Sequence, residues 1–213
     1  MVKLIVPPTL TARRFARGLE RLTSHHRYFA RVVERFGPPP LWERAPGFST
    51  LIHIILEQQV SLASALAAFK RLESAAQPLS PQTFLALDDA ALRTIGFSRQ
   101  KTAYGRHLSH AILDGSLDLD TLHTRSDDDA RAGLMQIKGI GSWSANIYLL
   151  MALLRPDIWP SGDLALAVAA QAVLRRKTRP SSLELDLLSV VWSPWRAVAA
   201  RILWHDYLSR RAG

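Results

Sequence analysis

The segment Ile137-Lys-Gly-Ile-Gly-Ser-Trp-Ser-Ala-Asn-Ile147 constrains the fold of this chain more than any other segment. Gly139 and Gly141 bracket one apolar residue, and an apolar run that opens at Ser142 continues to Leu154. Glycine adopts positive φ and lets a second backbone approach closely, so this spacing predicts a tight turn that leads into a helix. The first amides of such a helix have no partners within the helix and can bind an anion such as a phosphate group.

The composition favours a polyanionic partner and excludes cysteine chemistry. The 213 residues include 27 Lys and Arg against 18 Asp and Glu, a formal net charge of +9. Such a surplus favours nucleic acid, although a proteome with high arginine usage would give the same balance. The absence of cysteine excludes disulfides, thiol nucleophiles and cysteine-ligated clusters. The seven histidines show no zinc-ligand spacing, so we expect no metal held by side chains.

Helical periodicity dominates the chain, and alternating strand patterns are scarce. We expect helices within 10–36, 48–56, 60–72, 81–94, 99–113, 126–135, 142–154, 164–175, 183–191 and 194–210. Ser98, Ser126 and Ser193 are placed to cap three of them. No apolar run reaches the roughly 18 residues of a membrane span, and the N-terminal run is too short for a signal peptide. We therefore expect no membrane association and a cytoplasmic location.

A single carboxylate stands at the start of a later helix. Asp163 follows Pro160-Ser-Gly162 and precedes an apolar run. An aspartate at this position is most often a helix cap, but it can also stabilise positive charge that develops on a substrate. A phosphate-binding turn followed by a solitary acid favours chemistry on nucleic acid.

Six segments in order carry a family resemblance: Ile54–Ser61, Gly96–Lys101, Gly139–Gly141, Pro160–Gly162, Asp163 and Trp192–Arg196. Together they resemble the HhH-GPD superfamily of DNA glycosylases, and within it the bacterial 3-methyladenine DNA glycosylase II subfamily, over about residues 46–210. The resemblance implies an all-α, two-lobed helical bundle with a helix-hairpin-helix at about 134–154 and an active site in the inter-lobe cleft. One lobe would comprise 46–150, and the other 1–45 plus 151–213. The full-length bacterial type also has an N-terminal α/β domain, so the chain resembles a compact form.

The resemblance implies a monofunctional, cofactor-free glycosylase that releases alkylated purines, such as 3-methyladenine and 7-methylguanine, from double-stranded DNA and leaves an abasic site. Trp143 occupies the hairpin position at which bifunctional relatives carry a Schiff-base lysine, and tryptophan has no amine to attack the sugar. Two alternatives remain open. One is a glycosylase for uracil or an oxidised purine, and the other is a non-catalytic helix-hairpin-helix module that only binds DNA. We expect a monomer, bacterial and associated with the nucleoid through DNA.

The resemblance assigns Asp163 the catalytic role. A flipped cationic base favours an aromatic pocket, for which the candidates are Trp143, Trp192 and Tyr148, with Ile147 at the family's tyrosine position. Aromatic residues at helical spacing are also common in cores. We assign Trp42, Trp159 and Trp204 to structure or to the rim of the site.

The DNA-binding candidates include the hairpin and the segments before it. They are Lys138, Gly139, Gly141, Ser142, Ser144, Gln58, Gln59, Arg99 and Lys101. Gln58 and Gln59 stand where the family inserts a wedge into the base stack, although they could also form a solvated helix end. In the family, hairpin carbonyls hold a Na⁺ or K⁺ ion, and here Met135, Ile137 and Ile140 would supply them. The basic run 175–179 is either a DNA contact or a solvated loop.

Overall fold

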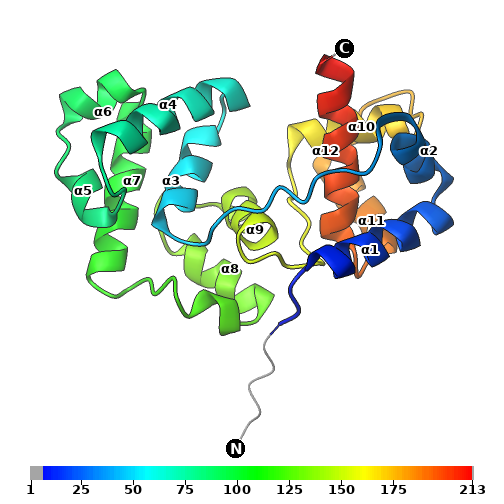
Figure 1. The fold of residues 1–213 in the computed structure, drawn as a ribbon, viewed down its shortest axis with the longest axis horizontal. Helices are drawn as coiled ribbons and strands as arrows, with labels where there is room; N and C mark the ends of the chain where they lie inside the picture. The colour runs from blue at the N-terminus through cyan, green and yellow to red at the C-terminus, as the bar shows by residue number, and fades with distance from the viewer. Residues whose placement is uncertain (1–6, 213) are drawn as a thin grey trace, which may run out of the picture. The chain divides into compact units, whose positions relative to one another are not determined.

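A computed structural model describes residues 7–212 of the chain. Within that range the chain is helical and contains no β-strand, which confirms the all-α prediction (Figure 1). The chain forms two compact units, one of Arg44–Leu153 and the other of Pro8–Glu43 with the residues from Leu154 onward. The sequence places the same kind of division at 45/46 and 150/151. Its assignment of residues 1–6 lies outside the described residues.

The first unit is built around two helices that are buried on nearly every side. Its elements are α3 (Phe48–Glu57), α4 (Leu62–Ala75), α5 (Pro81–Leu85), α6 (Asp89–Ile95), α7 (Arg99–Leu113), the 3₁₀ turn η1 (Leu122–Thr124), α8 (Asp127–Met135) and α9 (Ser142–Met151). Helix α3 packs against α4, α7 and α9. Its apolar side chains from Leu51 to Leu56 are at most 2% exposed. A helix that is apolar around most of its circumference must be buried, so α3 and α9 form the centre of this unit.

The second unit combines N-terminal and C-terminal helices. Its elements are α1 (Ala12–His25), α2 (Arg27–Phe36), α10 (Leu164–Val173), α11 (Ser182–Ser189), the 3₁₀ turn η2 (Val190–Trp192) and α12 (Arg196–Ala212). Helix α12 packs against α1, α2 and α10. The guanidinium of Arg201, in its middle, is fully buried and donates to the carbonyls of Leu41 and Ala197 at 2.6 and 3.0 Å. Burial lowers the pKa of Arg201 to about 9.

Two of the three expected serine caps are confirmed. Ser98 Oγ accepts from the amide of Lys101 at 3.2 Å, and Ser126 Oγ accepts from the amide of Asp129 at 3.1 Å. The cap at Ser193 is wrong, because α12 begins only at Arg196. The amide of Arg196 donates instead to Asp157 Oδ1 at 3.2 Å, from an aspartate distant in sequence. No helix in the described part of the chain is long and apolar enough to cross a membrane.

Candidate functional site

Asp163 is held at the N-terminus of α10 by two donors on the same oxygen. Its Oδ1 accepts from the amide of Leu166 at 2.9 Å and from the indole Nε1 of Trp204 at 3.2 Å. The amide bond is an N-cap interaction, and the positive end of the helix dipole favours a carboxylate there. The partly buried carboxylate is therefore fixed in place, by one local bond and one from α12. Trp204, which the sequence assigned to structure or to the rim, contacts the candidate catalytic group directly.

The loop that carries Asp163 is clamped by a second carboxylate. Asp186, on α11, accepts from Ser161 Oγ through Oδ2 at 2.6 Å and from Trp159 Nε1 through Oδ1 at 3.1 Å. Gly162 has φ = 79°, a conformation that glycine adopts without a steric cost. These contacts fix the path of the chain immediately before the catalytic candidate. No local sequence pattern points to Asp186, because its two partners lie 25 and 27 residues away along the chain.

The hairpin between α8 and α9 contains two glycines, which differ in whether the fold has room for a side chain. Gly139 has φ = 98°, and a Cβ placed there would lie 2.1 Å from Cγ of Tyr104. Gly141 has φ = −88°, and a Cβ there would meet nothing within 4 Å. The fold therefore requires glycine at 139 but leaves an open space at 141. No side chain caps α9, whose N-cap residue is Gly141.

Gln58 braces this hairpin from the end of α3. Its Nε2 donates to the carbonyl of Gly139 at 2.8 Å and to Ser144 Oγ at 2.9 Å. The next residue, Gln59, is exposed and has φ = 58°, and Val60 beside it is 48% exposed. Of the two candidate wedge residues, Gln58 is thus tied to the hairpin, while Gln59 lies at the exposed tip of the turn. Ser144 is buried and serves the brace rather than an exposed surface.

The basic candidates differ in how they are engaged. The ammonium of Lys101 donates to the carbonyl of Leu56 at 2.7 Å, and burial lowers its pKa. Lys101 therefore anchors the last turn of α3, directly before Gln58. Arg99 and Lys138 are exposed, as are Gly141 and Ser142 at the start of α9.

Three of the four pocket candidates lie in the cores of their units. Tyr148 is fully buried, its hydroxyl accepts from the amide of Gly47 at 2.9 Å, and burial raises its pKa. Ile147 is 2% exposed. Trp192 is 1% exposed and donates to the hydroxyl of Tyr28 at 2.9 Å. The structure gives these three a packing role, as expected of aromatic and apolar residues at helical spacing, and leaves Trp143 partly exposed in the first turn of α9.

The described residues contain no group of three His, Cys, Asp or Glu side chains that could hold a metal ion. A monovalent cation would instead need the hairpin carbonyls. The carbonyl of Ile137 accepts from the amide of Ile140 at 2.9 Å. A carbonyl oxygen has a second lone pair, so this bond is compatible with a cation ligand at Ile137.

Residues 52–194 match the family model of the HhH-GPD superfamily base excision DNA repair proteins. The putative DNA-3-methyladenine glycosylase YfjP of Bacillus subtilis is 28% identical over 183 residues, which cover 82% of this chain and 64% of that protein. DNA-3-methyladenine glycosylase 1 of Schizosaccharomyces pombe is 26% identical over 190 residues, which cover 87% of this chain and 83% of that protein.

Solved structures agree with the sequence relatives. The S. pombe 3-methyladenine DNA glycosylase Mag1 in complex with abasic DNA superposes with a TM-score of 0.82 at 25% identity, covering 88% of this chain and 95% of that one. A DNA-3-methyladenine glycosidase from Bacillus halodurans gives a TM-score of 0.74 at 26% identity, covering 92% and 91%.

Proposed function

The chain belongs to the HhH-GPD superfamily of base excision DNA repair proteins, and from this premise we propose that it is a DNA glycosylase for alkylated purines. The proposed reaction is hydrolysis of the N-glycosidic bond of 3-methyladenine and 7-methylguanine in double-stranded DNA. Two relatives that are named for this activity match most of the chain. We propose that the protein acts as a monomer and that its reaction leaves an abasic site in the DNA.

One observation carries the proposal: the anchored carboxylate of Asp163. Two hydrogen bonds to Oδ1, one of them from Trp204, hold the group in a single orientation. Breaking an N-glycosidic bond builds positive charge on the deoxyribose, and a preorganised carboxylate stabilises that charge without reorganising during the reaction. The same carboxylate can orient the water whose oxygen forms the new bond to the sugar carbon as the bond to the base breaks.

A lone carboxylate suits a substrate that is already a cation. An N3- or N7-alkylated purine carries positive charge, so the base leaves as a neutral molecule and needs no general acid. The attacking water releases its proton to solvent. Unmodified and deaminated bases leave as anions unless they are protonated, and we therefore assign them slow release. This difference in leaving-group charge is the basis for choosing alkylated purines as the substrate class.

The hairpin supplies the proposed grip on DNA. Gly141 leaves open space beside an uncapped helix N-terminus, where a phosphate can approach the backbone amides. Lys138 is exposed in the same turn and adds positive charge. We also assign the hairpin carbonyls of Met135, Ile137 and Ile140 to a Na⁺ or K⁺ ion. Such an ion would add positive charge for a DNA phosphate.

Gln59 is the proposed wedge that fills the stack when the target base is flipped out. Flipping costs a few kcal/mol, so a residue that replaces the lost stacking lowers the free energy of the flipped state. Gln59 is exposed at a turn tip with an exposed Val60 beside it, and Gln58 braces that turn against the hairpin. For the base, Trp143 remains the pocket candidate with accessible surface. Because it has no amine, we propose no lyase activity.

The test is to incubate the protein with DNA methylated in vitro and to identify the released bases by chromatography. We expect 3-methyladenine and 7-methylguanine, with release abolished by Asp163→Asn. That variant should still bind a duplex with an abasic-site analogue. Release of uracil faster than 3-methyladenine would overturn the substrate assignment. Undiminished release by Asp163→Asn would overturn the role of the carboxylate.

A further inference from the structure

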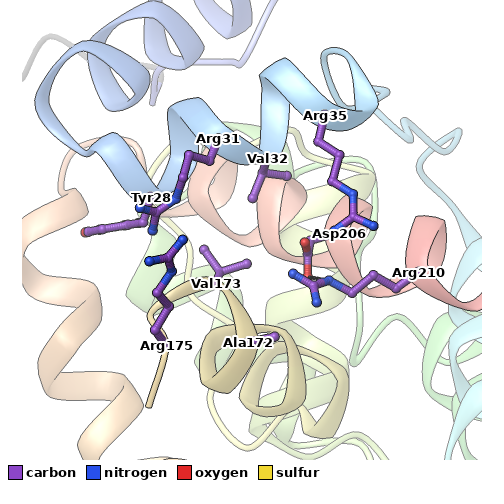
Figure 2. Close-up of a pocket in the computed structure, with 9 residues that line it drawn as sticks. All are labelled: Tyr28, Arg31, Val32, Arg35, Ala172, Val173, Arg175, Asp206 and Arg210. Atoms are coloured by element: carbon purple, nitrogen blue, oxygen red, sulfur yellow. Dashed lines mark ion pairs between the residues drawn. The ribbon is translucent and has the colours of Figure 1, made fainter.

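A hollow of about 200 Å³ lies within the second unit, away from Asp163 (Figure 2). Its walls come from α2, the C-terminal end of α10 and α12. The lining residues are Tyr28, Arg31, Val32, Arg35, Ala172, Val173, Arg175, Asp206 and Arg210. Asp163 is at the opposite end of α10, and ten helical residues span roughly 15 Å. The hollow is therefore separate from the carboxylate site.

Its charge is strongly unbalanced. Four guanidinium groups face a single carboxylate, that of Asp206, which is 1% exposed and lies 2.8 Å from Nε of Arg210. Figure 2 shows Arg35 and Arg210 converging on Asp206, whereas the guanidinium groups of Arg31 and Arg175 point toward one another. Within residues 7–212, neither of those two guanidinium groups has a hydrogen bond or an ion pair with another residue. Two like charges thus converge without a counter-charge.

Helix dipoles account for part of this arrangement. Arg35 and Arg210 lie in the last turns of α2 and α12, and Arg175 follows the end of α10. Each helix C-terminus carries about half a negative charge, so three ends offset about 1.5 of the three uncompensated positive charges. A surplus remains, and Arg31 is in the middle of α2 rather than at its end. The dipoles therefore leave the approach of Arg31 to Arg175 unexplained.

We propose that the hollow binds a phosphate group, with Arg31 and Arg175 as the main ligands and Arg35 at the rim. Guanidinium groups bind phosphate through paired N–H donors, and two that converge can hold one phosphate between them. The volume exceeds the roughly 30 Å³ share of one water several-fold, which leaves room for an attached sugar over the apolar Val32 and Val173. The phosphate comes from a nucleic-acid strand or from a free nucleotide, and the chemistry recognised is the same.

The wall beside these arginines is rigid. The hydroxyl of Tyr28 accepts from Trp192 Nε1 at 2.9 Å and is 3.0 Å from Nδ1 of His26. Burial raises the pKa of Tyr28, so its phenol stays neutral and does not repel an anion. Tyr28 thus provides a fixed, neutral wall beside Arg31, while Arg175 is exposed and open to an incoming anion.

The experiment compares the wild-type protein, the double variant Arg31→Gln/Arg175→Gln and the control Arg13→Gln, an exposed arginine of α1 outside the hollow. Melting temperatures are measured with inorganic phosphate or AMP against sodium chloride of equal ionic strength. Binding to an undamaged duplex is measured as a function of salt. We expect at least one phosphate probe to bind the wild type and Arg13→Gln about tenfold more tightly than the double variant, the loss that one or two charge-assisted hydrogen bonds produce.

Which probes the double variant binds less tightly than the wild type identifies the source of the phosphate. Loss of phosphate and AMP binding with unchanged duplex binding indicates a free nucleotide. A lower duplex affinity, with a salt slope reduced by about one phosphate contact, indicates a nucleic-acid strand. Equal binding of every probe by the wild type and the double variant, or no binding by either, would overturn the proposal. None of these measurements uses base release, so they remain informative if the proposed glycosylase activity fails.

Discussion

The indole Nε1 of Trp204 donates a hydrogen bond of 3.2 Å to Oδ1 of Asp163, across 41 residues of sequence. The same oxygen accepts the local N-cap bond from Leu166. One carboxylate oxygen is thereby engaged from two directions, and the orientation of the whole carboxylate is set. Trp204 acts through Asp163 and is a positioning residue for the proposed reaction.

Replacing Trp204 by Phe keeps most of the ring volume and removes the N–H donor. Because a hydrogen bond to a charged group contributes about 1.5–3 kcal/mol, we expect kcat for base release to fall about tenfold or more. The affinity for DNA should not change, since we assign the grip on DNA to the hairpin and the role of Trp204 to the carboxylate of Asp163. Single-turnover release and duplex binding measure the two quantities separately.

A purely structural role for Trp204 would give a different result. In that case the melting temperature would fall, and kcat measured well below it would be unchanged. A double-mutant cycle on folding stability, with Asp163→Asn as the second substitution, provides the other criterion. If the two side chains are coupled through their hydrogen bond, their effects on the free energy of unfolding should not add.

Substitution by alanine should lower folding stability at one hairpin glycine and leave it nearly unchanged at the other. Gly139→Ala places a Cβ 2.1 Å from the ring of Tyr104 at a φ of 98°, and the positive φ alone costs alanine about 1–2 kcal/mol. We expect a clear loss of folding stability in a urea titration. Tyr104→Ala in the same chain should relieve the clash and leave the backbone cost.

Gly141→Ala is the matched control for the fold and a test of the proposed DNA grip. Its φ is −88° and its Cβ would meet no atom within 4 Å, so stability should stay within about 0.5 kcal/mol of the wild type. A methyl group there occupies the space that we assign to a DNA phosphate, so duplex affinity should fall severalfold. Unchanged affinity would contradict the assignment of Gly141 to the DNA surface.

Gln59→Ala tests the wedge. Removing the side chain that replaces the flipped base should lower base release roughly tenfold, about 1.4 kcal/mol in the barrier. The side chain is exposed, and at φ = 58° alanine and glutamine both pay the steric cost of a Cβ, so folding stability should hardly alter. Gln58→Ala gives the contrast. It removes the brace to Gly139 and Ser144, and should lower stability as well as activity.

Local features of the fold were predictable because their causes lie within a few residues. Ser98 and Ser126 cap helices through amides three positions ahead, a distance that sequence spacing can identify. The start of α12 was not predictable in the same way, since Asp157 rather than Ser193 binds its first amide, from 39 residues away. A local serine-proline pattern cannot reveal a competing distant acceptor.

In the candidate site, too, local features could be predicted from the sequence and distant contacts could not. Asp163 and the glycine turn could be identified from order and spacing along the chain. Trp204, Asp186 and the brace from Gln58 to Gly139 depend on tertiary contacts between helices. One physical signal was present in the sequence: a buried indole N–H requires an acceptor, so a tryptophan on an apolar helix face implies a polar partner nearby.

Acid should destabilise the protein through His53. Its ring stacks on that of Phe69 with 4.2 Å between the ring centroids. Burial lowers the pKa of His53 below 6.5, and Arg44 lowers it further. The carboxylates of Glu57 and Glu73 raise this pKa, but by less than burial lowers it. Above about pH 7 this histidine is neutral in the folded and the unfolded chain and adds no pH dependence. As the pH falls through 6.5 the unfolded chain binds the proton first, and the free energy of unfolding decreases.

His53→Phe removes that proton site and keeps a ring against Phe69. Melting temperatures between pH 7.5 and 5.5 should therefore decline less steeply for the variant than for the wild type. A change in packing alone would shift the melting temperature of the variant by the same amount at every pH. Burial and the neighbouring His25 also lower the pKa of His26, so adding His26→Phe should flatten the profile further. Parallel profiles for all three proteins would show that neither histidine couples protonation to folding.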